Sequence, residues 1–295
     1  MLDLDDGARL FVEEVGPANS DRGVVFLHGS ALRTDAWYYQ LEGIGDHRLV
    51  FYDLRGHGIS QPRGDKPYNI KTLGEDLLRV VEDAGLTECI IVGHSIGGMI
   101  ALDLCSERKD LMGSLIQGLV LANTTYRPAV ETLAGGAAIS RLERFTRRPF
   151  DGLGSYHQRL DLLRRIIKPS DAVFMMVSFA AFGPKASAKQ IDFTYDMLAE
   201  TPTDILFDLI KSYREFDVRD VLGEITVPAL VIGGEQDRLT VSDASRHLAE
   251  HLPKAELVML EECGHMTMLE RHHDFNLMVE GFLDDHLGRS GSLKG

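Results

Sequence analysis

The sequence lacks any run of about eighteen consecutive apolar residues, the length that a membrane-spanning helix requires. Its opening stretch, MLDLDDGARL, holds neither the basic segment nor the apolar segment of a secretory signal. We therefore expect neither a transmembrane span nor a signal peptide.

Cysteine is also scarce, with 3 in 295 residues. An odd count does not fit a disulfide framework, and Cys89 and Cys105 both fall within apolar-patterned segments. Free thiols of this kind are usual in a reducing compartment, so we predict a cytoplasmic protein.

Positive charge is in the minority, because 31 Lys and Arg residues face 45 Asp and Glu residues, for a formal net charge of -14. Nucleic acids and anionic membranes are bound through basic surfaces, so we expect neither as a partner. The hydrophobic content of 44% is enough for a packed core, in one large α/β domain or two small ones. Nothing in the sequence indicates an oligomeric state.

Short apolar segments alternate with helical patterns along the chain. The segments that we expect to be strands are 8–16, 23–29, 47–56, 89–94, 118–124, 228–235 and 255–262. Several are continuous in Val, Ile and Leu, which is typical of strands buried on both faces of a parallel sheet. Residues 70–86 and 97–111 have the apolar spacing of helices. This alternation predicts a doubly wound α/β sheet with helices on both faces.

Residues 126–219 interrupt this alternation of strands and helices, because they contain helical patterns and no convincing strand. We predict that they form a helical cap, or lid, over the sheet. Residues 1–125 and 220–288 would then form the α/β core, and we expect the last segment, 289–295, to be a disordered tail.

The segment GHSIGG places Ser95 between Gly93 and Gly97, at the end of a predicted strand and before a predicted helix. This is the context that a G-x-S-x-G nucleophile turn requires. A sharp strand-to-helix turn strains its central residue, so the residues two positions to either side must be small. The alternative is a chance match in a glycine-rich turn. We predict that Ser95 is a nucleophile.

A serine hydroxyl needs a base to become a strong nucleophile. Among 11 histidines, His265 follows the last predicted strand and so lies at the same edge of the sheet. His94 is adjacent to the serine and points elsewhere, and we expect it to pack near the turn. His272 and His273 lie in the final helical region, and we expect them on the surface. These two histidines also lack the spaced partners of a metal site, and we predict no metal or organic cofactor.

The histidine in turn needs a carboxylate to hold its tautomer. Asp237 follows the strand 228–235, and it gives the chain order Ser, Asp, His of one known triad arrangement. Glu235 is the nearest competitor. An acid placed after the earlier strand 118–124 is the other known arrangement, but that position holds Asn123. We favour Asp237.

An oxyanion would be bound by two backbone N–H groups, those of Ile96, after the nucleophile, and Ser30, in the loop after the strand 23–29. His28 precedes this loop. We expect it to shape the loop while Ser30 donates the hydrogen bond.

Together these segments resemble the α/β-hydrolase superfamily in order and spacing. They are HGS (28–30), DLRGHGIS (53–60), GHSIGG (93–98), GGEQD (233–237) and GHMTMLE (264–270). The resemblance implies a mostly parallel central sheet flanked by helices, with a helical cap inserted after the sixth strand of that fold. It also implies a structural part for Asp53, Arg55 and His57. It does not identify a substrate, because this fold hosts many reactions.

Ser95 stands where family members that open epoxides or remove halides have Asp, so the resemblance implies a serine esterase or lactonase. We expect a carboxylic ester hydrolase that forms an acyl-enzyme on a small, largely apolar substrate. The alternative is a small-molecule receptor or regulator, which uses the same fold and triad with slow turnover.

The segment FMMVSFAAF (174–182) is unusually apolar, and methionine adapts to irregular apolar shapes. One hypothesis assigns Met175, Met176 and Phe179, together with Met266 beside the predicted base, to an acyl-binding pocket. The alternative is that the cap residues pack within the cap itself.

Overall fold

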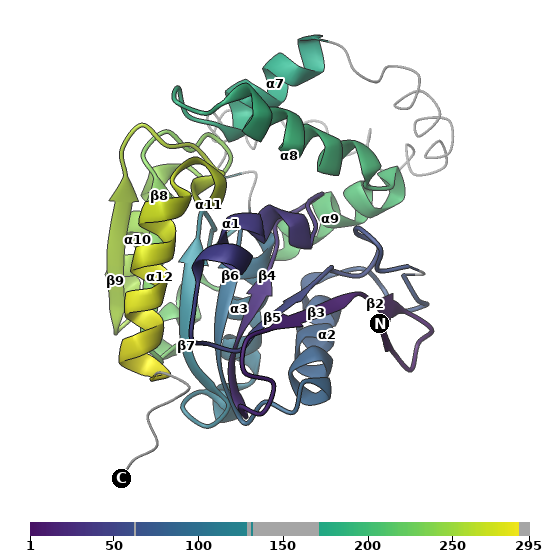
Figure 1. Cartoon of the computed structure of the whole chain (residues 1–295), viewed down its shortest axis with the longest axis vertical. Helices are drawn as coiled ribbons and strands as arrows, with labels where there is room; N and C mark the ends of the chain where they lie inside the picture. Colours follow the sequence, from purple (N-terminus) through teal and green to yellow (C-terminus); the bar gives the residue numbers. More distant parts are fainter. Residues whose placement is uncertain (62, 129–130, 132–170, 289–295) are drawn as a thin grey trace.

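Figure 1 shows the computed structural model of the chain, which describes residues 1–61, 63–128, 131 and 171–288. The predicted tail 289–295 and the part of the predicted cap between residues 132 and 170 lie outside the described residues.

A seven-stranded sheet forms the centre of the fold, with the strand order β3-β5-β4-β6-β7-β8-β9. The strands are β3 (Val12–Val15), β4 (Arg22–Leu27), β5 (Leu49–Tyr52), β6 (Glu88–His94), β7 (Ile116–Ala122), β8 (Ala229–Gly234) and β9 (Ala255–Leu260). Only the pairing of β3 with β5 is antiparallel within this sheet. The predicted fold class, a mostly parallel sheet flanked by helices, is therefore confirmed.

One predicted strand, 8–16, is divided in two. β2 (Arg9–Leu10) pairs with β1 (Leu2–Asp3) in a small separate sheet, and β3 joins the main sheet. The break falls at Phe11, whose N–H donates to Ser60 Oγ at 2.8 Å instead of to a neighbouring strand. The strand is thus interrupted by a hydrogen bond to a side chain that is distant in the sequence. The local apolar pattern of residues 8–16 contains no sign of that partner.

Helices cover both faces of the main sheet. One layer consists of α2 (Ile70–Asp83), α3 (Ile96–Glu107) and α10 (Ser242–His251), and the other of α1 (Tyr38–Gly43), α11 (Thr267–Glu270) and α12 (His272–His286). Because successive strand residues point to opposite faces, Val25 and Leu27 of β4 pack in the first layer, whereas Val24 and Phe26 pack in the second. Short 3-10 turns lie at 34–37, between β4 and α1, at 109–111, between α3 and β7, and at 219–224, just before β8.

Between β7 and β8 the chain leaves the sheet, where the sequence predicted an insertion. In the described part of this insertion lie α7 (Asp171–Ala181), α8 (Ala188–Glu200) and α9 (Thr203–Glu215). α8 begins with a capping box, in which Ser187 and Gln190 exchange side-chain and backbone hydrogen bonds. Figure 1 shows α7, α8 and α9 above the end of the sheet to which the parallel strands run. These three helices are called the cap helices below.

None of the helices in the described ranges has the length and apolar character needed to cross a membrane.

Two buried histidines fasten the loops at the carboxyl ends of the strands. His28 Nε2 accepts the Leu54 N–H at 2.9 Å, and His57 Nε2 accepts the Ala31 N–H at 3.2 Å. Both side chains are fully buried, and burial lowers the pKa of His28 to about 4 and that of His57 to about 3. Protonation would turn each accepting nitrogen into a donor that faces another donor.

These histidines predict a loss of stability in acid. In the unfolded chain a histidine binds a proton below about pH 6.5, whereas the folded chain binds none at these sites until near pH 4. The free energy of unfolding therefore falls as the pH drops from 6.5 toward 4, by about 1.4 kcal/mol per pH unit for each histidine.

His57→Gln keeps an acceptor for Ala31 but removes the proton site. Urea unfolding at pH 7, 6 and 5 should show a shallower slope for this variant, with His273→Gln as the exposed control. Parallel curves for wild type and His57→Gln would contradict the prediction.

Candidate active site

Ser95 sits in the sharp turn between β6 and α3, with φ 55° and ψ -118°. This is a strained conformation for a residue with a side chain. A Cβ atom at Gly93 would lie 2.5 Å from the carbonyl carbon of Gly97, and one at Gly97 would lie 2.4 Å from the backbone oxygen of Leu27. The two glycines are therefore required sterically, as the sequence predicted. The turn leaves Ser95 partly exposed at the carboxyl end of β6.

His265 and Asp237 are in direct contact in the loops that follow β9 and β8. Nδ1 of His265 lies 2.8 Å from Oδ2 of Asp237. Because a carboxylate only accepts hydrogen bonds, Nδ1 carries the proton and Nε2 keeps a free lone pair. Glu235, the competitor named from the sequence, pairs instead with Arg246.

Asp237 is buried yet remains ionised, because polar groups surround it. Burial raises its pKa, but the charge of His265 and hydrogen bonds from His265, Asn123 and the Thr240 backbone outweigh burial, so the pKa lies below its usual value. The Leu239 N–H and the Thr240 hydroxyl also donate to it. The carboxylate is thus held in one orientation.

Asn123 is the polar neighbour that sequence reasoning missed, since it was considered only as a position lacking an acid. Its Nδ2 donates to Asp237 Oδ2 at 2.8 Å and to the Gly264 carbonyl at 3.2 Å. Its Oδ1 accepts the Thr267 hydroxyl at 2.6 Å. Its φ is 45°, which Asn tolerates better than most residues, but this angle is known only from the structure.

The loop after β4 places the Ser30 N–H near the N-terminus of α3. Asp53 accepts the Thr34 and Ile59 N–H groups, and His57 holds the Ala31 N–H, so the DLRGHGIS segment braces this loop. The backbone N–H groups of Ser30 and Ile96 make no hydrogen bond to an acceptor within the described ranges. Both are therefore available to a ligand.

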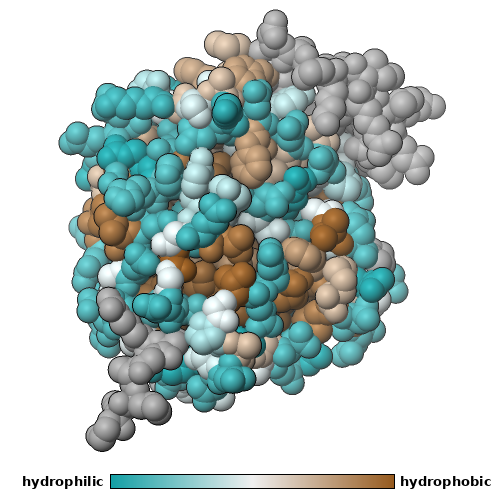
Figure 2. Space-filling model, in the orientation of Figure 1, coloured by the Kyte–Doolittle hydropathy of each residue, from teal (hydrophilic) through white to brown (hydrophobic). Residues whose placement is uncertain are grey.

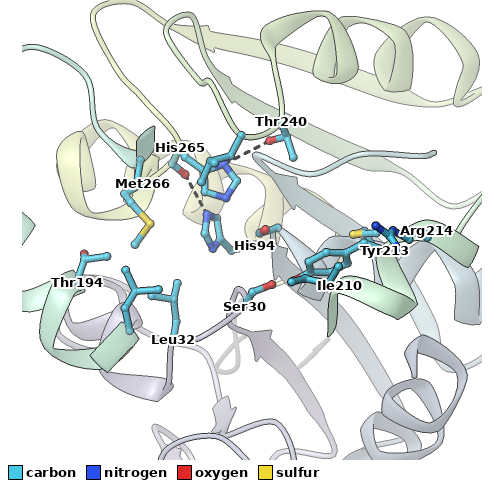
Figure 3. Close-up of a pocket in the computed structure, with 15 residues that line it drawn as sticks. Ser30, Leu32, His94, Thr194, Ile210, Tyr213, Arg214, Thr240, His265 and Met266 are labelled. Carbon is cyan, nitrogen blue, oxygen red and sulfur yellow. Dashed lines mark hydrogen bonds between the residues drawn. The ribbon is translucent and has the colours of Figure 1, made fainter. Parts of the chain in front are cut away.

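A cavity of about 340 Å³ opens between the sheet and the cap helices (Figure 3). Its walls come from the loops after β4, β6, β8 and β9 and from α7, α8 and α9. They are formed by Ser30, Leu32, His94, Ser95, Met99, Ala181, Thr194, Leu198, Ile210, Tyr213, Arg214, Leu239, Thr240, His265 and Met266. The structure thus brings Ser95, His265, Ser30 and Met266 into one cavity.

The other residues predicted for substrate binding lie elsewhere, and this corrects the sequence-based assignment. Met175, Met176 and Phe179 do not line the cavity and are 62%, 62% and 66% exposed. In the space-filling view, apolar atoms are visible where α7 lies (Figure 2). The guanidinium of Arg238 stacks on the Phe179 ring. The apolar composition of α7 did not reveal that these three side chains face away from the cavity.

One further group of possible metal ligands lies on the surface of α10. Potential ligand atoms of His247, Glu250 and His251 lie within 4.8 Å of one another. Nδ1 of His251 is already engaged by the His247 carbonyl, at 2.9 Å. None of the three lines the cavity that contains Ser95.

Comparison with known proteins identifies the family to which the fold belongs. The family described as "alpha/beta hydrolase fold" matches residues 23–272. A protein named "Putative carbamate hydrolase RutD" from Pseudomonas savastanoi pv. phaseolicola is 30% identical over 240 residues, which is 81% of this chain and 84% of that protein. The chain therefore belongs to the α/β-hydrolase fold family and is a hydrolase of that fold.

Solved structures show the same fold. An esterase (EaEST) from Exiguobacterium antarcticum aligns with a TM-score of 0.72 at 21% identity, over 95% of this chain and 97% of that one. Est816, described as an N-acyl homoserine lactone degrading enzyme, aligns with a TM-score of 0.70 at 22% identity, over 95% and 99% of the two chains.

The contacts of Asn123 predict that it positions Asp237. Asn123→Gly removes the amide while allowing the positive φ, so it should slow the reaction of Ser95 with a fluorophosphonate by about 10-fold, the loss expected for one hydrogen bond to a charged group. Asp237→Asn, which also disturbs the tautomer of His265, should lower that rate further. The rate of inactivation and the melting temperature are measured together. A variant that melts earlier but is labelled as fast as wild type would show that Asn123 is only structural.

Proposed function

We propose that the protein is a serine hydrolase that cleaves a carboxylic ester or lactone through an acyl-enzyme intermediate. The observation that carries this proposal is the contact of Asp237 with His265, which lines the same cavity as Ser95. A nucleophile, a base with a free Nε2 and a buried carboxylate are the parts that acyl transfer by a serine requires.

In the first half of the reaction, Ser95 Oγ attacks the carbonyl carbon while Nε2 of His265 takes the hydroxyl proton. The carbonyl oxygen becomes an oxyanion, which the N–H groups of Ser30 and Ile96 bind. In enzymes where one such donor was removed, transition-state stabilisation fell by about 2.7–4 kcal/mol. The bond to the alcohol oxygen then breaks, and His265 returns its proton to the leaving alcohol.

In the second half, His265 takes a proton from a water molecule, whose oxygen attacks the acyl carbon of the ester on Ser95. The second tetrahedral intermediate uses the same two N–H groups. Its collapse releases the carboxylic acid, and the proton on His265 returns to Ser95.

Substrate size and polarity follow from the cavity. Its volume of about 340 Å³ suits a small molecule, and most of the accessible surface of its walls is apolar. Proteins of the same fold are named as an esterase and as a lactone-degrading enzyme, and the name of the 30% identical relative assigns it carbamate hydrolysis. Esters, lactones and carbamates share a carbonyl carbon that a serine can attack, and carbamates are therefore included in the test.

The cytoplasm remains the compartment that we favour. Cys89, Cys105 and Cys263 are all buried and free, as is usual in a reducing environment.

Substitution of the nucleophile tests the proposal. Ser95→Ala should lower kcat on a p-nitrophenyl ester series, from acetate to decanoate, by roughly 10⁴-fold or more, because it removes the acyl acceptor. Wild type should also gain the mass of one acyl group at Ser95 when the reaction is stopped early. The control is Ser114→Ala, whose hydroxyl bonds only the Asp110 carbonyl on a distant loop.

Other results separate the alternatives. Activity retained in Ser95→Ala would refute a serine nucleophile. If Ser95 is acylated but each ester, lactone and carbamate is turned over only once and slowly, the receptor hypothesis would be favoured over an enzyme.

A further inference from the structure

Buried hydroxyl groups without partners gather around the cavity. In the part of the chain that the structure describes, the buried side-chain hydroxyls that lack a hydrogen-bond partner are those of Ser30, Tyr52, Thr194 and Tyr213. All but Tyr52 line the cavity that contains Ser95. Such groups are rare in folded proteins, so their presence around one cavity requires an explanation.

An unpaired buried hydroxyl is costly because it has lost its hydrogen bonds to water and gained none in the protein. The cost disappears when a ligand supplies the missing partner. Thr194 lines the cavity and is only 2% exposed, so bulk water does not supply the missing partner of its hydroxyl. Burial raises the pKa of Tyr213, which therefore stays a neutral phenol and a good hydrogen-bond donor.

The rest of the cavity wall limits what kind of partner fits. Between the hydroxyls the wall is formed by apolar side chains, those of Leu32, Met99, Ala181, Leu198, Ile210, Leu239 and Met266. Arg214 also reaches the cavity, but it is exposed and already has an interaction of its own. The groups offered to a ligand away from the reacting centre are thus neutral hydroxyls, which suit an uncharged acceptor oxygen.

The hydroxyls are distributed along the cavity and not clustered at one point. Figure 3 shows Thr194, from α8, and Tyr213, from α9, on opposite sides of His94, with Ser30 between them. Ser30 belongs to the reacting centre, because its N–H is one of the two oxyanion donors. Thr194 and Tyr213 are therefore placed to meet the two portions of a substrate that extend from the scissile carbonyl in opposite directions.

We propose that Thr194 and Tyr213 determine specificity by hydrogen bonding to an uncharged acceptor oxygen, such as that of a ketone, amide or ether, on the acyl and alcohol portions of the substrate. The substrate class is then an ester or lactone with a polar group within an otherwise apolar chain, and not a plain alkyl ester. This proposal rests on the proposed acyl hydrolase function and adds the substrate class to it. A site built to hydrogen-bond a group discriminates against the analogue that lacks it, because its own polar atoms are left unpaired.

Matched substrate pairs test the proposal. For the acyl side the pair is p-nitrophenyl 5-oxohexanoate and p-nitrophenyl hexanoate, and for the alcohol side it is 2-methoxyethyl hexanoate and butyl hexanoate. Within each pair the shape is similar and only the remote oxygen differs. Wild type should prefer the polar member of at least one pair by about 10-fold or more in kcat/KM, the gain expected for one satisfied hydrogen bond in an apolar site.

Two isosteric variants assign the preference. Thr194→Val and Tyr213→Phe should each abolish the preference for the polar member on one side. Thr194→Ser, which keeps a hydroxyl, should restore the preference. Tyr52→Phe is the matched control, because it removes a buried, unpaired phenol that does not line the cavity. It should leave every ratio unchanged.

The same pairs are also titrated into Ser95→Ala, so that the preference is read from Kd whether or not an ester turns over. Absence of turnover with a preserved preference in Kd would overturn the hydrolase function but support the role of the two hydroxyls. Equal kcat/KM and equal Kd within both pairs would overturn the specificity proposal and leave the hydrolase function in place. Ratios that stay unchanged in both Thr194→Val and Tyr213→Phe would also overturn it.

Discussion

The turn at Ser95 is the steric constraint on which the rest of the site depends. The chain passes from a buried strand into a helix at a single residue held at φ 55°. This path exists only because Gly93 and Gly97 leave room for the backbones of α3 and β4 to approach. The close approach of Gly97 to Leu27 brings the first turn of α3 next to the loop after β4. The same constraint therefore exposes the Ser95 hydroxyl and sets beside it the two N–H groups that we propose as oxyanion donors.

A second set of interactions holds the loops around that turn. His28, Asp53 and His57 use neutral or buried polar atoms to bind backbone N–H groups of the loops after β4 and β5. Asp237 is held in a similar way by donors from three segments of the chain. Buried polar groups of this kind are stabilising only when all are satisfied, which makes the loops rigid. The unpaired hydroxyls around the cavity differ from these groups, because they have no hydrogen-bond partner among the described residues.

The convergence of the side chains that we propose as the reacting centre was predictable because their positions follow from topology. In a parallel sheet the carboxyl ends of all strands meet at one edge, so side chains that follow three different strands must converge. Ser95, Asp237 and His265 each follow a predicted strand directly. The cap differs, because the end of a helix does not fix which of its side chains will face the cavity. The apolar composition of α7 suggested a pocket, but Met175 and Phe179 are exposed. The side chains that reach the cavity from α8 and α9 include Thr194 and Tyr213.

The sequence by itself determined the sheet, the strained turn and the order of the reacting residues, since each depends on local patterns of apolar residues and glycine. Only the tertiary structure decided which face of each cap helix meets the cavity, that Asn123 supports Asp237, and that the N-terminal strand breaks at Phe11. In each case the deciding partner is distant in the sequence. Contacts between distant segments depend on how whole elements pack, and no local pattern encodes them.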